Sequence, residues 1–175
     1  MNCERYTRNF PFMLKENGVD GMRLLVPLTM ACLIQASGFY GIDWHVLESL
    51  RIVEAGHVGE ARQNRNGTYD LGPFQINTSW ISRISREGHR TDSSAIRNNG
   101  CANAWFAAYI LKREIVAAPH QSVWTAIGSY HSHRPREAER YRKRVFRVLI
   151  GLYKKEKSQK GTGLTGSFVV AGRNP

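Results

Sequence analysis

The chain has 175 residues, enough for one domain with a buried core and terminal extensions. Its 42% hydrophobic and 22% charged residues exclude a disordered protein. The formal net charge of +11 is compatible with nucleic acid, anionic lipid or bacterial cell wall as an acidic partner, and equally with a charge that only confers solubility.

Residues 1–38 are predicted to be an N-terminal extension and signal peptide. The apolar run 24–34 is too short to span a bilayer and is followed by small residues, which predicts cleavage near Gly38 and export to the periplasm. A buried core helix and an uncleaved membrane anchor are the competing interpretations. The sequence leaves open whether the chain starts at Met1 or Met22.

The three cysteines, Cys3, Cys32 and Cys101, are too few and too scattered to predict a disulfide framework. They also lack the spacing of metal ligands. Cys101 lies among small and apolar neighbours, so we expect a buried small hydrophobic residue there. No metal and no cofactor are expected.

A helix is predicted after Asp43, which is a good N-cap. Its apolar residues recur at helical spacing at Val46, Leu47, Leu50 and Val53. Gly56 is a natural stop, so Glu54 falls in the last turn. The polar stretch 62–69, centred on Asn66-Gly67, predicts a small β-hairpin.

Four further helices are expected along the chain. The first opens at Asn77 or Thr78 and ends at Gly88, and the second carries its apolar face from Ala104 to Ile115. The third follows Ser122, and the last starts at Pro135. We therefore predict a mostly α fold of the α+β type, with a single helical domain over residues 39–153 and a flexible basic tail over residues 154–175.

Glu54 is the predicted catalytic acid. Protonation of a glycosidic oxygen near neutral pH requires a carboxylic acid with a raised pKa. The apolar neighbours of Glu54 and the negative end of a helix dipole both raise a carboxyl pKa. Downstream, Gln75 and Asn77 offer amides to sugar hydroxyls, and Phe74 offers a ring to cover a pyranose face.

Three runs in order resemble the motifs of the lysozyme-like lytic transglycosylases, most closely the small conjugation and secretion members of the TrbN type. The runs are Val53-Glu54-Ala55-Gly56, Gly72-Pro73-Phe74-Gln75-Ile76-Asn77 and Ala126-Ile127-Gly128-Ser129-Tyr130-His131-Ser132. The resemblance covers residues 42–146. It departs from the family at Ala55, where a serine is usual, at Pro73-Phe74 and at His131-Ser132-His133.

The resemblance implies a lysozyme-like fold that acts on the β-1,4 link between N-acetylmuramic acid and N-acetylglucosamine. It implies that Glu54 protonates the glycosidic oxygen and then accepts the proton of the C6 hydroxyl, which closes a 1,6-anhydro ring. It also implies that Gln75 and Tyr130 contact substrate. Glycan strands of peptidoglycan would be the partner, together with components of a conjugation or secretion machine, and no specific nucleic acid is expected.

Three other functions stay open. Asp70 could be a second carboxylate, which would make the protein a hydrolytic lysozyme. The basic helix 136–155 could bind nucleic acid in a transfer apparatus, although the sequence has no recognised nucleic-acid-binding motif. A non-catalytic wall-binding protein is the third. A metal site at His131 and His133 is a weaker hypothesis, because no Cys or acidic cluster supports it.

Overall fold

The computed structural model describes residues 24–88 and 91–162, with side chains up to residue 159. Over these residues the protein is mostly helical with a small three-stranded antiparallel sheet, so the predicted mostly α, α+β class is confirmed. None of the helices described is long and apolar enough to cross a membrane.

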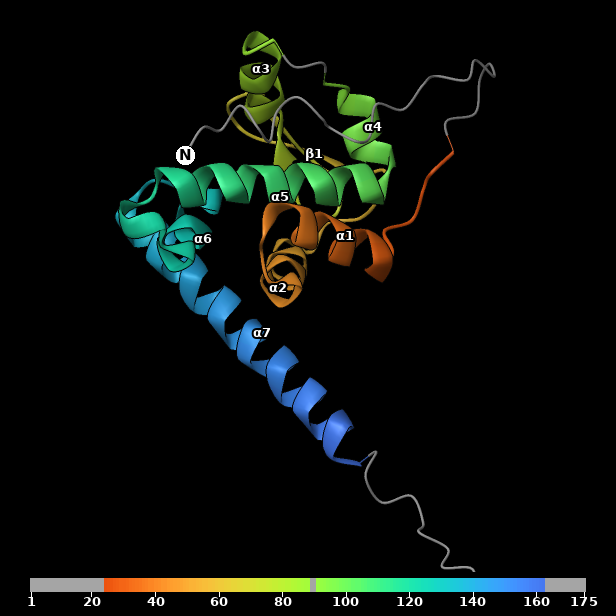
Figure 1. Cartoon of the computed structure of the whole chain (residues 1–175). Helices are drawn as coiled ribbons and strands as arrows, with labels where there is room; N and C mark the ends of the chain where they lie inside the picture. The colour runs from red at the N-terminus through yellow and green to blue at the C-terminus, as the bar shows by residue number, and fades with distance from the viewer. Residues whose placement is uncertain (1–23, 89–90, 163–175) are drawn as a thin grey trace, which may run out of the picture.

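Helix α5 (Gly100–Ala117) forms the centre of the body and is buried along most of its length. Helices α1 (Met30–Tyr40) and α2 (Trp44–Glu54) lie on one side of it (Figure 1). The sheet, α3 (Thr78–Arg86) and α4 (Ser93–Asn98) lie on the other. The core is therefore built on both sides of one apolar helix.

The sheet contains β1 (Ala61–Gln63), β2 (Tyr69–Leu71) and β3 (Ile76–Asn77) in that order. The β1–β2 hairpin is the one predicted around Asn66-Gly67, and Gly67 supplies the positive φ of its turn. Strand β3 was not predicted, since two residues are too short to show an alternating pattern.

A short 3₁₀ turn, η2 (Pro119–Gln121), connects α5 to α6 (Val123–His131), and α7 (Pro135–Thr162) follows. Helix α6 begins after Ser122, whose hydroxyl caps it as expected. Helix α7 starts against α6 and α2 and then extends beyond the body as one long rod (Figure 1).

The predicted flexible tail differs from the structure over residues 154–162, which continue α7. This stretch is rich in Lys, Glu and Gln, which favour helix, and its first half is anchored. Tyr153 donates a hydrogen bond to Asp43, and Glu156 lies 2.9 Å from Nε2 of His45 near the start of α2. Residues 163–175 lie outside the described part.

The predicted start of the domain at residue 39 also differs from the structure, because α1 is part of the core. Leu33, Ala36 and Tyr40 of this helix are buried against α5. The interpretation of a core helix, which the sequence left open, therefore describes residues 30–40. The predicted N-terminal extension and the choice between Met1 and Met22 as the start concern residues 1–23, which lie outside the described part.

Cys32 and Cys101 form a disulfide that joins α1 to α5. The interpretation of Cys101 as a free small hydrophobic residue was wrong, although the residue is buried. A separation of 69 residues gives no local sequence signal, so only the packing of α1 on α5 brings the two thiols together.

Candidate active site

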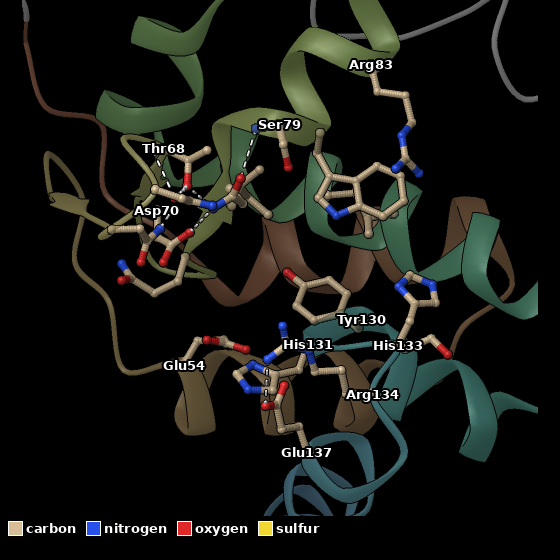
Figure 2. A pocket seen from close by; sticks show the side chains of 18 of the residues that line it. Glu54, Thr68, Asp70, Ser79, Arg83, Tyr130, His131, His133, Arg134 and Glu137 are labelled. Atoms are coloured by element: carbon tan, nitrogen blue, oxygen red, sulfur yellow. Dashed lines mark hydrogen bonds and ion pairs between the residues drawn. The ribbon is translucent and has the colours of Figure 1, made fainter.

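A cleft of about 740 Å³ opens between two walls of different construction (Figure 2). The helical wall, from the end of α2, α6 and the start of α7, contributes Glu54, Tyr130, His131 and Glu137. The sheet wall, from the hairpin and the turn before α3, contributes Asn64, Thr68, Asp70, Gln75 and Asn77. Four of the five predicted site residues, Glu54, Gln75, Asn77 and Tyr130, thus line one cleft.

Glu54 is the last residue of α2, and its half-buried carboxyl borders the cleft. Burial raises its pKa from 4.5 to about 7, and the charge of Asp70 acts in the same direction. A hydrogen bond from Tyr141 and the charges of Arg144 and Arg62 oppose this rise. The carboxyl therefore holds a proton up to neutral pH, as a general acid requires.

Two long-range hydrogen bonds from α7 hold the end of α2. The hydroxyl of Tyr141 donates to Oε1 of Glu54 at 2.6 Å, and Nη2 of Arg144 donates to the carbonyl oxygen of Val53 at 3.0 Å. The second bond satisfies a carbonyl that a helix C-terminus leaves free. The position of the acid is thus fixed from residues about ninety positions downstream.

Tyr141 is a site residue that sequence reasoning missed. Its side chain is buried like that of a core residue, and only its hydroxyl distinguishes it from one. The ring of His131 stacks on it with centroids 4.6 Å apart. Desolvation and the nearby Arg144 guanidinium hold the pKa of His131 below its usual value.

The backbone turns sharply at the residue after Glu54 and then runs close to the sheet wall. Ala55 adopts a left-handed conformation with φ of 54°, one residue before the predicted stop. A Cβ on Gly56 would overlap the carbonyl oxygen of Gly72 and the amide of Gln75. Glycine at position 56 therefore lets the acid and the predicted substrate-contacting glutamine lie close together.

The side chain of Gln75 is positioned by its own turn. Its Nε2 donates to the carbonyl oxygen of Gly72 at 2.9 Å, and its backbone has a positive φ of 48°. One of its two amide hydrogens is thus engaged, and the rest of the amide is available to a ligand in the cleft.

Asn77 makes internal contacts that sequence reasoning did not foresee. Its Nδ2 donates to Asp70 at 2.7 Å and to Thr68 at 2.9 Å, and its Oδ1 caps α3 through the N–H of Ser79. Both amide hydrogens are therefore used by the protein. Asn77 shapes the sheet wall and orients Asp70, and it has little left to offer a sugar hydroxyl.

Buried Asn103 of α5 clamps the turn that carries Gln75. Its Oδ1 accepts from the N–H of Phe74, and its Nδ2 donates to the carbonyl oxygens of Leu71 and Ile96, all at 2.9 Å. Each bond satisfies a backbone group that burial would otherwise leave unpaired. A polar residue in the apolar first half of this helix was the sequence signal for it.

The prediction that Phe74 covers a sugar ring was wrong. The side chain is 0% exposed and belongs to the hydrophobic core, so no ligand can reach it. Its carbonyl oxygen instead accepts a hydrogen bond from the hydroxyl of Tyr130 at 3.2 Å. Trp80 lines the cleft instead, with the guanidinium of Arg83 4.7 Å from the centroid of its ring.

The two histidines considered as metal ligands have separate surroundings. His131 stacks on Tyr141, whereas Nε2 of His133 lies 3.2 Å from Glu114. Among the described residues, no group of three or more His, Cys, Asp or Glu side chains is arranged to hold a metal ion.

No family model matches the chain. The chain is 26% identical over 137 residues to the "Invasion protein IagB" of Salmonella typhimurium strain SL1344. The aligned residues make up 74% of this chain and 83% of that protein. The protein of the same name from strain LT2 gives the same values. The similarity extends over most of both chains.

Proposed function

We propose that this protein is a lytic transglycosylase of the lysozyme-like family that cleaves the glycan strands of peptidoglycan. The observation that carries the proposal is Glu54, a carboxyl at a cleft edge with a pKa of about 7 and a fixed hydrogen-bond donor, Tyr141. The order of the three sequence motifs and the similarity to an invasion protein support it.

In the proposed reaction Glu54 donates its proton to the glycosidic oxygen, and the bond from that oxygen to C1 of the muramoyl residue breaks. The resulting carboxylate then accepts the proton of the C6 hydroxyl as O6 bonds to C1. The product is a 1,6-anhydro sugar, and Glu54 regains its proton, so no water is consumed. Tyr141 keeps the carboxyl aimed in both steps.

Hydrolysis with Asp70 as a second carboxylate is the competing reaction. Asp70 borders the same cleft, and its charge raises the pKa of Glu54. We favour the transglycosylase because Oδ1 of Asp70 accepts a hydrogen bond from Asn77, which gives that carboxylate a role in the sheet wall.

We further propose that the protein acts in the periplasm, beside a conjugation or secretion machine. The Cys32–Cys101 disulfide supports an oxidising compartment. The name of the similar protein refers to invasion, and a machine that reaches another cell has to pass the wall.

Because cleavage near Gly38 would remove Cys32, we propose that processing leaves Cys32 in the exported chain. The mass of the N-terminal peptide after alkylation, with and without reduction, tests this.

Digestion of purified sacculi by the full chain tests the enzyme. Wild-type protein should release anhydro-muropeptides, which are lighter than hydrolysis products by one water, and Glu54→Gln should release none. Glu48→Gln is the control, since Glu48 lies on the same helix and pairs with Arg51. Products with reducing ends would assign hydrolysis, and equal turnover by the Glu54 variant would remove the proposed acid.

A further inference from the structure

Helix α7 carries a basic stripe on the side that faces away from the core. The stripe consists of exposed residues spaced by three, four or seven positions, so they project from one side of the helix: Arg136, Arg140, Lys143, Arg147 and Lys154. The buried residues Tyr141 and Val145 lie on the opposite side. The stripe runs along α7 from its start to the stretch where Tyr153 and Glu156 contact the start of α2.

Most of this charge is not neutralised within the protein. Lys143 lies 3.3 Å from Glu139, but Arg140, Arg147 and Lys154 have no acidic partner among the described residues. Unpaired cations in a row on one helix create a strong local positive potential. The stripe therefore favours an extended anionic surface as its partner.

An aromatic patch lies beside the stripe. It consists of Val123 and Trp124 at the start of α6 and Phe146 of α7, whose side chains are 41%, 40% and 49% exposed. The rings of Trp124 and Phe146 pack edge to face with centroids 5.5 Å apart. Phe146 directly precedes Arg147 of the stripe, so apolar and cationic groups share one region of the surface.

The aromatic patch lies away from the cleft. Phe146 follows the cleft residue Glu137 by nine positions, which is about two and a half helical turns and places the two side chains on opposite sides of α7. A partner bound at the aromatic patch would therefore leave the cleft open.

We propose that the basic stripe and the aromatic patch dock the protein on an anionic phospholipid bilayer. Clustered Lys and Arg are drawn to acidic headgroups, and Trp and Phe settle at the boundary between headgroups and acyl chains. The straight outer side of a long helix fits a flat surface.

Nucleic acid fits these features less well. Base stacking uses open ring faces within a charged groove, whereas the stripe lies on the convex side of a helix. The edge-to-face pairing of Trp124 and Phe146, with an aliphatic valine at the same surface, gives no such platform. The inference goes beyond the proposed function and does not require catalysis.

Cosedimentation of the full chain with vesicles tests the surface. The protein should bind equimolar phosphatidylglycerol and phosphatidylcholine at low salt, bind far less to phosphatidylcholine alone, and release at high salt. Each arginine near an acidic membrane contributes about fivefold to partitioning, so Arg140→Gln with Arg147→Gln should weaken binding about twenty-five-fold. The matched control is Arg86→Gln with Arg97→Gln, which removes the same charge from exposed residues of α3 and α4 and should bind as the wild type.

Two further results decide the proposal. Phe146→Gln should weaken binding while thermal unfolding stays as in the wild type, and the blue shift of tryptophan emission on binding should vanish in Trp124→Phe. Equal binding by the two double variants would overturn the proposal. So would tighter binding to double-stranded DNA than to vesicles through Arg140 and Arg147, which would assign the stripe to nucleic acid.

Discussion

The two walls of the cleft are held in different ways. The acid of the helical wall is fixed by side chains of α7 that are far away in the sequence, through Tyr141 and Arg144. The sheet wall is organised mainly by short-range turns, in which Gln75 and Asn77 bond to neighbours less than ten residues away. The position and pKa of Glu54 thus depend on how distant helices pack, whereas the shape of the sheet wall depends largely on local turns.

Asn103 ties the sheet wall to the core through long-range hydrogen bonds to Leu71 and Phe74, and its loss should have the largest effect. Asn103→Ala removes three buried hydrogen bonds and leaves their backbone partners unpaired, which should lower the free energy of unfolding by about 4 kcal/mol. Urea unfolding measures it. Asn98→Ala, which removes one contact to Ser94, is the control, and a similar loss in both variants would contradict the clamp.

Glu54→Gln tests how much the half-buried carboxyl of Glu54 lowers the free energy of unfolding. The folded protein keeps a proton that the unfolded chain releases between pH 4.5 and about 7, so its stability falls as pH rises through this window. The amide carries no charge, and the variant should be more stable than the wild type at pH 7.5 by about 2 kcal/mol, after allowance for partial exposure. The gain should vanish near pH 4. Urea unfolding of both proteins at several pH values across this range measures the difference in the free energy of unfolding. A difference that is constant with pH would contradict the raised pKa of Glu54.

Tyr141→Phe sharpens the assignment of Tyr141 as a positioning residue. Its hydrogen bond lowers the pKa of Glu54, so the variant should shift the alkaline limb of the rate profile to higher pH. Loss of the aiming contact should also lower the rate of sacculus digestion about tenfold. Exposed Tyr69→Phe should change neither quantity. A slower enzyme with an unshifted profile would point to a purely structural role.

Asp70→Asn should have the smallest effect. Removal of its charge lowers the pKa of Glu54 and moves the alkaline limb to lower pH, opposite to Tyr141→Phe. The rate below this limb should stay within about threefold of the wild type in a transglycosylase, because one acid suffices when the substrate supplies the nucleophile. Abolished activity would favour the hydrolase.

Local sequence signals predicted much of the fold. Asp43, Asn77 and Ser122 cap helices as expected, since capping needs only a side-chain oxygen and the next backbone N–H groups. The Asn66-Gly67 turn formed the expected hairpin. Helix α4 was missed because its six residues give no clear apolar period.

For the candidate site, four of the five predicted residues border one cleft, and the structure gives Phe74 and Asn77 other contacts than the sequence predicted. Glu54, Gln75 and Tyr130 line the cleft, but Phe74 is in the core. The side-chain amide of Asn77 donates both of its hydrogens to Asp70 and Thr68. Residue type and spacing do not reveal which side of a turn faces solvent. Trp80 illustrates the converse, since it borders the cleft although the sequence did not single it out.

The sequence by itself determined the helical class, the hairpin and the place of Glu54 at a helix end, because periodicity, caps and turn residues act over a few positions. The sequence predicted a raised pKa for Glu54, but only the tertiary structure decided that burial and Asp70 raise it. The Tyr141 contact and the Cys32–Cys101 disulfide were likewise decided by the tertiary structure alone. Burial and long-range contacts depend on how distant helices pack. Electrostatic environment is therefore a property of the folded chain and not of any segment of it.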